Sequence, residues 1–341
     1  MNRREPNFEN LLKVLRNEVP DRPTLFELYM NMQLFAQANG CKPAAEDPVS
    51  ILRFKVDGFR NLGYDYATDY GADCFFGWGD HAVGDTVSLN DGSVIFDEES
   101  FDAYVWPDYK AADYSRLEKI APFLPDGMKL NVMQPGGVLE NVLYLVGYDN
   151  LCYMIYDEPE LVQRLFDEVG SRLVDYCRIS AQHDTVGVIS INDDWGFNTQ
   201  TMLSPDQMRQ YVFPWTKKIV EAAHAEGKPV ILHSCGNLWS MFDEILALGV
   251  DAKHSFEDKI VPIEEAYETW HDKIPLMGGF DVDFLCRRPV EDIKNRVAAM
   301  MERTKDRGGW AVGSGNSIPN YIPVPQYLAM VETALGYNPM G

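Results

Sequence analysis

The feature that most constrains this chain is an alternation of short apolar runs with helical patterns along its whole length. Eight runs have β-strand character, and each leads into a polar or small residue and then into a segment of helical periodicity. Val186–Asn192 is apolar almost throughout, which is typical of a parallel strand covered on both faces. The eight runs are Thr24–Phe26, Asp73–Phe76, Lys129–Met133, Val186–Asn192, Pro229–Ser234, Asp251–Ser255, Pro275–Gly279 and Trp310–Ser314.

The helical segments between these runs have recognisable ends. Ser204-Pro205-Asp206-Gln207 is a capping box with proline at the first helical position, and the helix it opens ends near Gly227. Further helices are expected from Pro159 to Gln182 and from Pro289 to Gly308. Repeated strand–helix units predict an α/β fold, a single (β/α)8 TIM barrel in which residues 1–341 form one domain. A doubly wound open sheet is the alternative.

One segment interrupts the alternation. Thr86–Leu89 and Ser93–Phe96 flank Asn90-Asp91-Gly92, a turn sequence that favours a β-hairpin. We expect a small hairpin inserted after the second strand.

Composition excludes several classes of partner. Lysine and arginine number 30 against 52 acidic residues, so the 341-residue chain carries a formal charge of −22. Nucleic acids and anionic membranes bind proteins through paired lysine and arginine, so neither is an expected partner. The N-terminus lacks the apolar stretch of a secretory signal, and the six scattered cysteines are those of a cytoplasmic protein with reduced thiols.

Ligand-type side chains collect where the predicted strands end, and active sites of TIM barrels lie at that end. These side chains are Gln134, Asp193, Asp194, His233, Cys235, His254, Glu257, Asp281, Asp283 and Asn316.

The most specific of these patterns is His233-Ser234-Cys235, followed by a Gly236-Asn237 turn. Alternate residues of a strand point to one side, so the imidazole and the thiolate can share a zinc ion. The alternative is a core histidine beside a small buried cysteine. A third ligand could come from Cys286, from His254 or from an aspartate.

Two adjacent acids and two tryptophans complete the candidates. Asp193 and Asp194 face opposite ways if the chain is extended, so one is expected to face the cleft while the other supports a loop. Either is a candidate metal ligand or general base, or a cap for the following turn. Trp195 and Trp239 are candidates for the pocket wall, with core packing as the alternative.

Several segments together resemble the uroporphyrinogen decarboxylase superfamily. They are Asp193-Asp194-Trp195-Gly196, Leu203-Ser204-Pro205, the run from Gly227 to Asn237, Leu248-Gly249-Val250-Asp251, Gly278-Gly279-Phe280-Asp281 and the run from Gly313 to Pro319. The resemblance implies a single (β/α)8 barrel and a homodimer.

The superfamily has two branches that must be distinguished. True decarboxylases carry an Arg-Gln-Ala-Gly-Arg element that holds substrate carboxylates, and here the matching stretch, Glu27–Met32, has no arginine. Cobalamin-dependent methyltransferases bind zinc through His-x-Cys and a later Cys. His233 and Cys235 match that pair, whereas Gly315-Asn316-Ser317 occupies the turn of the later Cys.

The methyltransferase branch implies zinc and a corrinoid carried by a partner protein. A methyl group would move between that corrinoid and a small thiol or methoxy substrate. Asp193 or Asp194 would orient the metal or accept a proton, and Gln134, Trp195, Trp239, Asp281 and Asn316 would line the substrate pocket. The alternatives are a metal-free lyase acting on a carboxylated or tetrapyrrole substrate and a non-catalytic binder of a tetrapyrrole or corrinoid. A lyase would need arginines in the mouth, for which Arg53, Arg60, Arg287 and Arg288 are the candidates.

Overall fold

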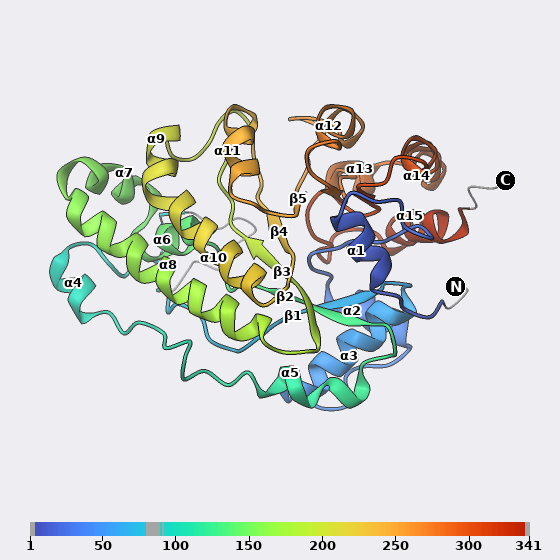
Figure 1. Ribbon diagram of the computed structural model, residues 1–341, viewed down its shortest axis with the longest axis horizontal. Coiled ribbons are helices and arrows are strands. Elements are labelled where there is room, and N and C mark those ends of the chain that lie inside the picture. Colours follow the sequence, from blue (N-terminus) through green and yellow to red (C-terminus); the bar gives the residue numbers. More distant parts are fainter. Residues whose placement is uncertain (1–3, 80–88, 91, 338–341) are drawn as a thin grey trace.

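The computed structural model describes residues 4–79, 89–90 and 92–337. Within these residues, a parallel sheet of seven strands runs in sequence order from β1 to β7. The sheet is curled, and the helices lie outside it (Figure 1). The strands are β1 Tyr66–Tyr70, β2 Lys129–Met133, β3 Val186–Asn192, β4 Val230–His233, β5 Ala252–His254, β6 Leu276–Met277 and β7 Trp310–Ala311.

Six of the eight predicted strands are confirmed, and β2 and β3 have the predicted bounds. The first predicted run, Thr24–Phe26, is not a strand in the described structure but forms one parallel bridge, between Leu25 and Val312. The amide of Phe26 donates to the carbonyl of Val312 at 2.7 Å, so this segment lies beside the end of β7, where an eighth strand was predicted.

The second predicted strand was wrong. Asp73–Phe76 is a loop, and the strand is β1, which precedes it. β1 contains a buried Asp69 that pairs with Lys55 at 2.6 Å and with Arg116 at 3.6 Å. The prediction placed this strand too late because β1 itself contains Thr68 and Asp69, whose burial depends on partners far away in the chain.

The predicted hairpin is not confirmed. Residues 86–88 and 91 lie outside the described residues. Of its second arm, Ser93–Phe96 is not a strand, because the amides of Val94 and Ile95 both donate to the carbonyl of Leu145 at 2.8 and 2.9 Å. That stretch therefore lies against the end of a helix rather than along another strand.

The helix ends predicted from the sequence are confirmed. Ser204 caps its helix through a capping box with Gln207. The predicted helix from Ser204 to Gly227 is formed by α9, a π-helical turn at Met208–Val212, and α10. In the described residues the helices are α1 Glu9–Leu15, α2 Met32–Asn39, α3 Pro48–Asn61, α4 Glu98–Ala103, α5 Ser115–Lys119, α6 Val138–Val146, α7 Tyr148–Asp157, α8 Pro159–Ala181, α9 Pro205–Gln207, α10 Phe213–Ala225, α11 Phe242–Ala247, α12 Ile263–Trp270, α13 Val282–Arg287, α14 Val290–Thr304 and α15 Val324–Gly336. None of them has the length and hydrophobicity needed to cross a membrane.

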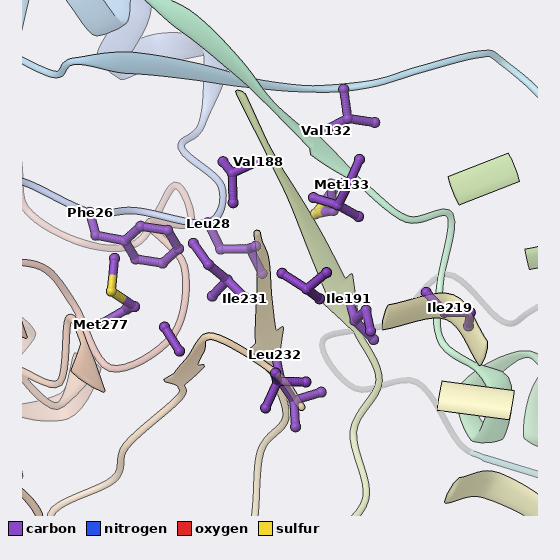
Figure 2. Packing of buried hydrophobic residues seen from close by; sticks show 14 of the residues in the cluster. Phe26, Leu28, Val132, Met133, Val188, Ile191, Ile219, Ile231, Leu232 and Met277 are labelled. Carbon is purple, nitrogen blue, oxygen red and sulfur yellow. The ribbon is translucent and has the colours of Figure 1, made fainter. Parts of the chain in front are cut away.

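Apolar side chains from several strands meet in one core. Figure 2 shows Phe26, Val188, Ile231 and Met277 contributing to it from the bridged N-terminal segment, β3, β4 and β6. Each of these side chains is buried almost completely. Removing their apolar surface from water stabilises the sheet, at about 25 cal/mol per Å². The sheet is thus a rigid base for the loops that follow its strands.

Strand register places the functional residues at one level. Asn192 of β3 lies beside His233 of β4, and His233 lies beside His254 of β5. All three end their strands. Residues that follow these strands therefore emerge together at one edge of the sheet.

Candidate metal centre

Three ligand-type side chains converge where β3 and β4 end. One ligand atom each from Asp194, His233 and Cys235 lies within 4.8 Å of the others. His233 Nε2 is 3.5 Å from Cys235 Sγ and 3.7 Å from Asp194 Oδ1. The predicted His–Cys pair is therefore brought together, and an aspartate, one of the predicted alternatives, is the third member.

These separations fit the geometry of a tetrahedral zinc site. With Zn–N and Zn–O near 2.0 Å and Zn–S near 2.3 Å, tetrahedral angles put N and S about 3.5 Å apart and N and O about 3.3 Å apart. The N–S separation matches at 3.5 Å, and the N–O separation is 3.7 Å. The donor set of imidazole, thiolate and carboxylate also suits zinc.

Asp193 and Asp194 have separate roles, as their opposite orientations predicted. Asp193 is fully buried, and its carboxylate accepts hydrogen bonds from the amides of Val138, Leu139 and Glu140 at 2.9, 3.2 and 2.9 Å. It therefore caps the N-terminus of α6. Burial raises the pKa of Asp193 to about 7. Asp194 instead belongs to the candidate metal site, where its Oδ1 accepts a hydrogen bond from the amide of Cys235 at 2.8 Å.

The sulfur of Cys235 has further polar neighbours. Asn316 Nδ2 donates to it at 3.3 Å, and Ser255 Oγ lies 3.5 Å away. Donors aimed at a sulfur favour its thiolate form. Burial and the nearby Asp194 nevertheless raise the pKa of Cys235 well above its usual value, whereas burial lowers the pKa of His233 to about 3.

The other two predicted ligands do not join the cluster. His254 is fully buried, with Nδ1 2.8 Å from His233 Nδ1 and Nε2 3.1 Å from the carbonyl of Ser314. Both of its nitrogens are therefore engaged elsewhere. Cys286 lies half-buried on α13 and is not in the group of converging ligand atoms among the described residues.

The predicted pocket residues divide into two groups. A pocket of about 580 Å³ lies beside the cluster, and Asp194, Cys235, Asp281 and Asn316 are part of its wall. Asp281 also caps α13, accepting the amides of Asp283 and Phe284 at 2.7 and 3.3 Å.

The remaining predicted wall residues are placed elsewhere, and this corrects the pocket assignment. Trp195 is fully buried against Phe213, with ring centroids 5.4 Å apart. Trp239 stacks on Trp270 at 4.0 Å in the helical layer. Gln134 is buried and donates to the carbonyl of Gly136 at 2.9 Å. Large aromatic side chains near strand ends were better explained by packing.

The pocket wall is strongly acidic. In its described part, Asp194, Glu257, Asp281 and Asp283 face a single lysine, Lys259, and no arginine. Burial, Asp281 and Asp194 raise the pKa of Glu257.

None of the four candidate arginines is part of the wall of this pocket, but Arg287 pairs with one wall residue, Asp283, at 2.5 Å. Arg53 lies over the ring of Phe123 at 4.5 Å, and Arg60 pairs with Glu5 at 2.8 Å. Arg287 and Arg288 line an adjoining pocket that shares Lys259, Asp281 and Asp283 with the pocket beside the cluster.

Sequence reasoning missed two buried charged residues near the cluster. Lys253 is buried in β5, and its Nζ donates to the carbonyls of Ser234 and His254 at 2.8 and 2.6 Å. It thereby ties the end of β4 to β5. Burial lowers the pKa of Lys253 to about 7. Glu27 is buried beside Ser314, which donates to it from its amide at 2.8 Å and from its hydroxyl at 2.6 Å. The available signal was a charged residue inside or directly after an apolar run.

Comparisons with known proteins agree with this architecture. The family model described as uroporphyrinogen decarboxylase (URO-D) matches residues 133–337. The uroporphyrinogen decarboxylase of Myxococcus xanthus is 25% identical over 155 residues, which cover 46% of this chain and 42% of that protein. That of Citrifermentans bemidjiense is 23% identical over 245 residues, covering 66% and 68%. The chain thus spans about half the length of most curated relatives it matches.

A solved structure covers nearly the whole chain. A methyltransferase from Methanosarcina mazei superposes with a TM-score of 0.68 over 97% of this chain and 98% of that one, at 16% identity. This likeness concerns the fold. The family match covers more than half of the chain and includes β3 to β7 with the cluster at their ends. The chain therefore belongs to the uroporphyrinogen decarboxylase family.

Proposed function

We propose that this family member is a zinc-dependent methyltransferase that moves a methyl group between a small thiol or methoxy compound and a corrinoid carried by a partner protein. The observation that carries the proposal is the convergence of Asp194, His233 and Cys235 at the wall of a pocket. The fold likeness to a methyltransferase is in keeping with it.

Each residue of the cluster and the pocket would have a separate role in the reaction. Zinc bound there would act as a Lewis acid on an ether oxygen or lower the pKa of a bound thiol. His233 would supply a neutral nitrogen from the buried side, while Asp194 and Cys235 would supply negative charge from the pocket wall. Glu257, with its raised pKa, is placed to take up or release the substrate's proton in the same pocket.

The charge of the pocket argues against the carboxylate-binding alternative. A lyase acting on a polycarboxylate would place several substrate carboxylates against a wall that, in its described part, has one lysine and four acids, of which only Asp283 is paired with an arginine, Arg287. Repulsion between like charges in a partly buried site would oppose binding. A neutral methoxy compound or a thiol carries no carboxylates, so it is not repelled by the acidic wall. A non-catalytic binder, in turn, would not need three ligand atoms this close together.

Exposed aromatic side chains around the same edge support docking of the partner protein. Tyr29, Phe75, Phe197 and Tyr321 are each at least 38% exposed. They follow the Leu25 bridge, β1, β3 and β7, so they come from four different loops at the carboxyl ends of the strands. Aromatic residues are enriched where proteins associate.

The test is a methyl-transfer assay on the zinc-loaded chain. Methylcobalamin is incubated with a panel of small thiols, and cob(I)alamin with methoxy compounds, while the corrinoid spectrum is followed. The proposal expects turnover with at least one panel, lost in Cys235→Ser and kept in His224→Gln, which alters an exposed histidine paired with Asp251. Turnover that persists undiminished in Cys235→Ser would contradict the proposal.

A further inference from the structure

A chain of hydrogen-bonded groups runs from the candidate metal site into the interior of the protein through two histidines. His233 Nδ1 lies 2.8 Å from His254 Nδ1, and His254 Nε2 lies 3.1 Å from the carbonyl oxygen of Ser314. The other ring nitrogen of His233, Nε2, faces Cys235 Sγ and Asp194. The carbonyl of Ser314 and the rings of His254 and His233 thus form a line that ends at the candidate metal site.

Hydrogen-bond chemistry assigns the protons along this line. A carbonyl oxygen only accepts, so His254 Nε2 must carry a proton and donate to Ser314. A neutral imidazole has one proton, so His254 Nδ1 is an acceptor. His233 Nδ1 must then donate to it, which leaves the lone pair of His233 on Nε2.

The opposite arrangement would place a charge in the interior. If His233 carried its proton on Nε2, its Nδ1 would accept, and His254 would need protons on both nitrogens. His254 would then be a fully buried cation whose two partners are an imidazole and a carbonyl, and neither of these carries a negative charge. Burying an uncompensated charge is costly, so the neutral arrangement is favoured.

We infer that His254 is a positioning residue that holds His233 in the tautomer whose Nε2 lone pair faces Asp194 and Cys235. The role in metal binding rests on the proposed function, whereas the tautomer rests on the hydrogen bonds alone. A metal-binding histidine needs a free lone pair, and a hydrogen bond from its other nitrogen fixes the ring and raises its basicity.

Ser314, at the far end of the line from the candidate metal site, is held in place by its own contacts. Both the amide and the hydroxyl of Ser314 donate to the buried carboxyl group of Glu27. Gly278 allows the close approach, because a Cβ there would lie 2.1 Å from the carbonyl oxygen of Ser314 and 3.2 Å from His254 Nε2. The ring of Phe26 packs edge-on against His254, with centroids 5.1 Å apart. The contacts of Glu27 and Phe26, which follow the Leu25–Val312 bridge, thus help to orient His254 and through it His233.

The first test reads the tautomer in the unaltered chain. Metal-free protein labelled with nitrogen-15 in histidine is examined by two-bond N–H correlation NMR at neutral pH, and a His233→Gln variant identifies the His233 signals. We expect a protonated Nδ1 and an unprotonated Nε2 on His233, and the reverse on His254. A protonated Nε2 on His233 would overturn the inference.

The second test removes the acceptor. His254→Leu is expected to abolish the tautomer preference of His233 and to weaken zinc binding by about 10- to 100-fold in competition with a chromophoric chelator. His254→Asn keeps an acceptor near the position of Nδ1 and should recover part of the loss. His224→Leu is the control for loss of a histidine far from the line and should bind zinc like the parent chain.

The results separate this inference from the proposed function. Folded His254→Leu that binds zinc as tightly as the parent chain would contradict the positioning role. A parent chain that binds no zinc but has the expected His233 tautomer would contradict the proposed function and leave the hydrogen-bond assignment standing. If His254→Leu does not fold, the NMR result on the unaltered chain decides the question.

Discussion

At the scale of single residues, two adjacent aspartates have different tasks. The carboxylate of Asp193 accepts three backbone amides of α6, while that of Asp194 belongs to the ligand cluster. The same substitution at the two positions should therefore produce different defects.

We predict that Asp194→Asn weakens zinc binding by more than about 100-fold, because losing a ligand costs more than losing a supporting hydrogen bond. Asp193→Asn should leave zinc stoichiometry intact and lower the free energy of unfolding by about 1–3 kcal/mol, since an NH2 donor replaces one of the two oxygens that accept the amides of α6. Chelator competition and urea unfolding of both variants measure the two effects. Equal loss of zinc affinity in both would contradict the division.

Glu27 gives the fold a pH dependence. Burial raises the pKa of Glu27 to about 8 from an ordinary value of 4.5. Between these values the folded chain keeps a proton that the unfolded chain loses, so the free energy of unfolding falls as pH rises. Stability from this group is complete below about pH 4.5 and is lost by about pH 8.

We predict that Glu27→Gln flattens this dependence. Urea unfolding at about pH 5 and about pH 8.5 should show a smaller decline in the variant than in the parent chain. The comparison with the parent chain removes the contribution of the other buried carboxyl groups. An identical decline in both proteins would show that Glu27 titrates as it does in the unfolded chain.

Residue identities alone predicted part of this site. The spacing of His233 and Cys235 predicted two members of the candidate metal site, because strand geometry puts alternate side chains on one side. The choice among Asp194, His254 and Cys286 depended on side-chain direction across neighbouring strands, which one sequence does not contain. His254 has the right chemistry for a ligand, but its two nitrogens are already hydrogen-bonded.

At the scale of elements, the loops after β3 and β4 cross at two glycines. Gly236 has φ of +94°, and a Cβ there would lie 2.2 Å from the carbonyl of Gly196. A side chain at this position must therefore push the two loops apart. Asp194 is on one loop and Cys235 on the other, so the ligand atoms would separate.

We predict that Gly236→Ala loses zinc affinity and destabilises the fold by about 1–3 kcal/mol. Gly227→Ala is the matched control, because Gly227 also has positive φ, +68°, but has nothing within 4 Å of its Cβ position. It should lose stability and keep zinc. If both variants bind zinc alike, the crossing of the loops does not position the ligands.

Strand prediction was most accurate for strands that are mostly apolar, although β5 was predicted in spite of its buried Lys253. β2, β3 and β4 were predicted to within a residue, and of these β3 and β4 are mostly apolar. β1 was missed because Asp69 is buried through ion pairs with Lys55 and Arg116, so polarity misrepresented its burial. Leu25 and Val312 form a bridge rather than a full strand pair, a difference of a few hydrogen bonds that apolar patterning does not resolve.

At the scale of the whole molecule, carboxylates and exposed aromatic side chains occur together at the carboxyl ends of the strands. The chain carries a formal charge of −22, the described pocket wall contains four of its carboxylates, and four exposed aromatic side chains lie in loops that follow strands. Such a surface suits a partner protein with a basic or neutral docking face.

We predict that Phe75→Ala slows methyl transfer to a protein-bound corrinoid by about tenfold and leaves transfer to free cobalamin unchanged. Phe75 is 44% exposed in the loop after β1 and is not part of the pocket wall. Phe123→Ala is the control, because Phe123 is 42% exposed but precedes β2, at the opposite end of the strands. Equal effects of the two substitutions would contradict docking at the mouth.

Metal analysis of the purified chain tests the central claim most directly. The account predicts about one zinc ion per chain, retained in Cys286→Ser and lost in Cys235→Ser, because Cys235 belongs to the ligand cluster and Cys286 does not. A parent chain that binds no zinc even when zinc is supplied, or a Cys235→Ser variant with the full complement, would contradict it.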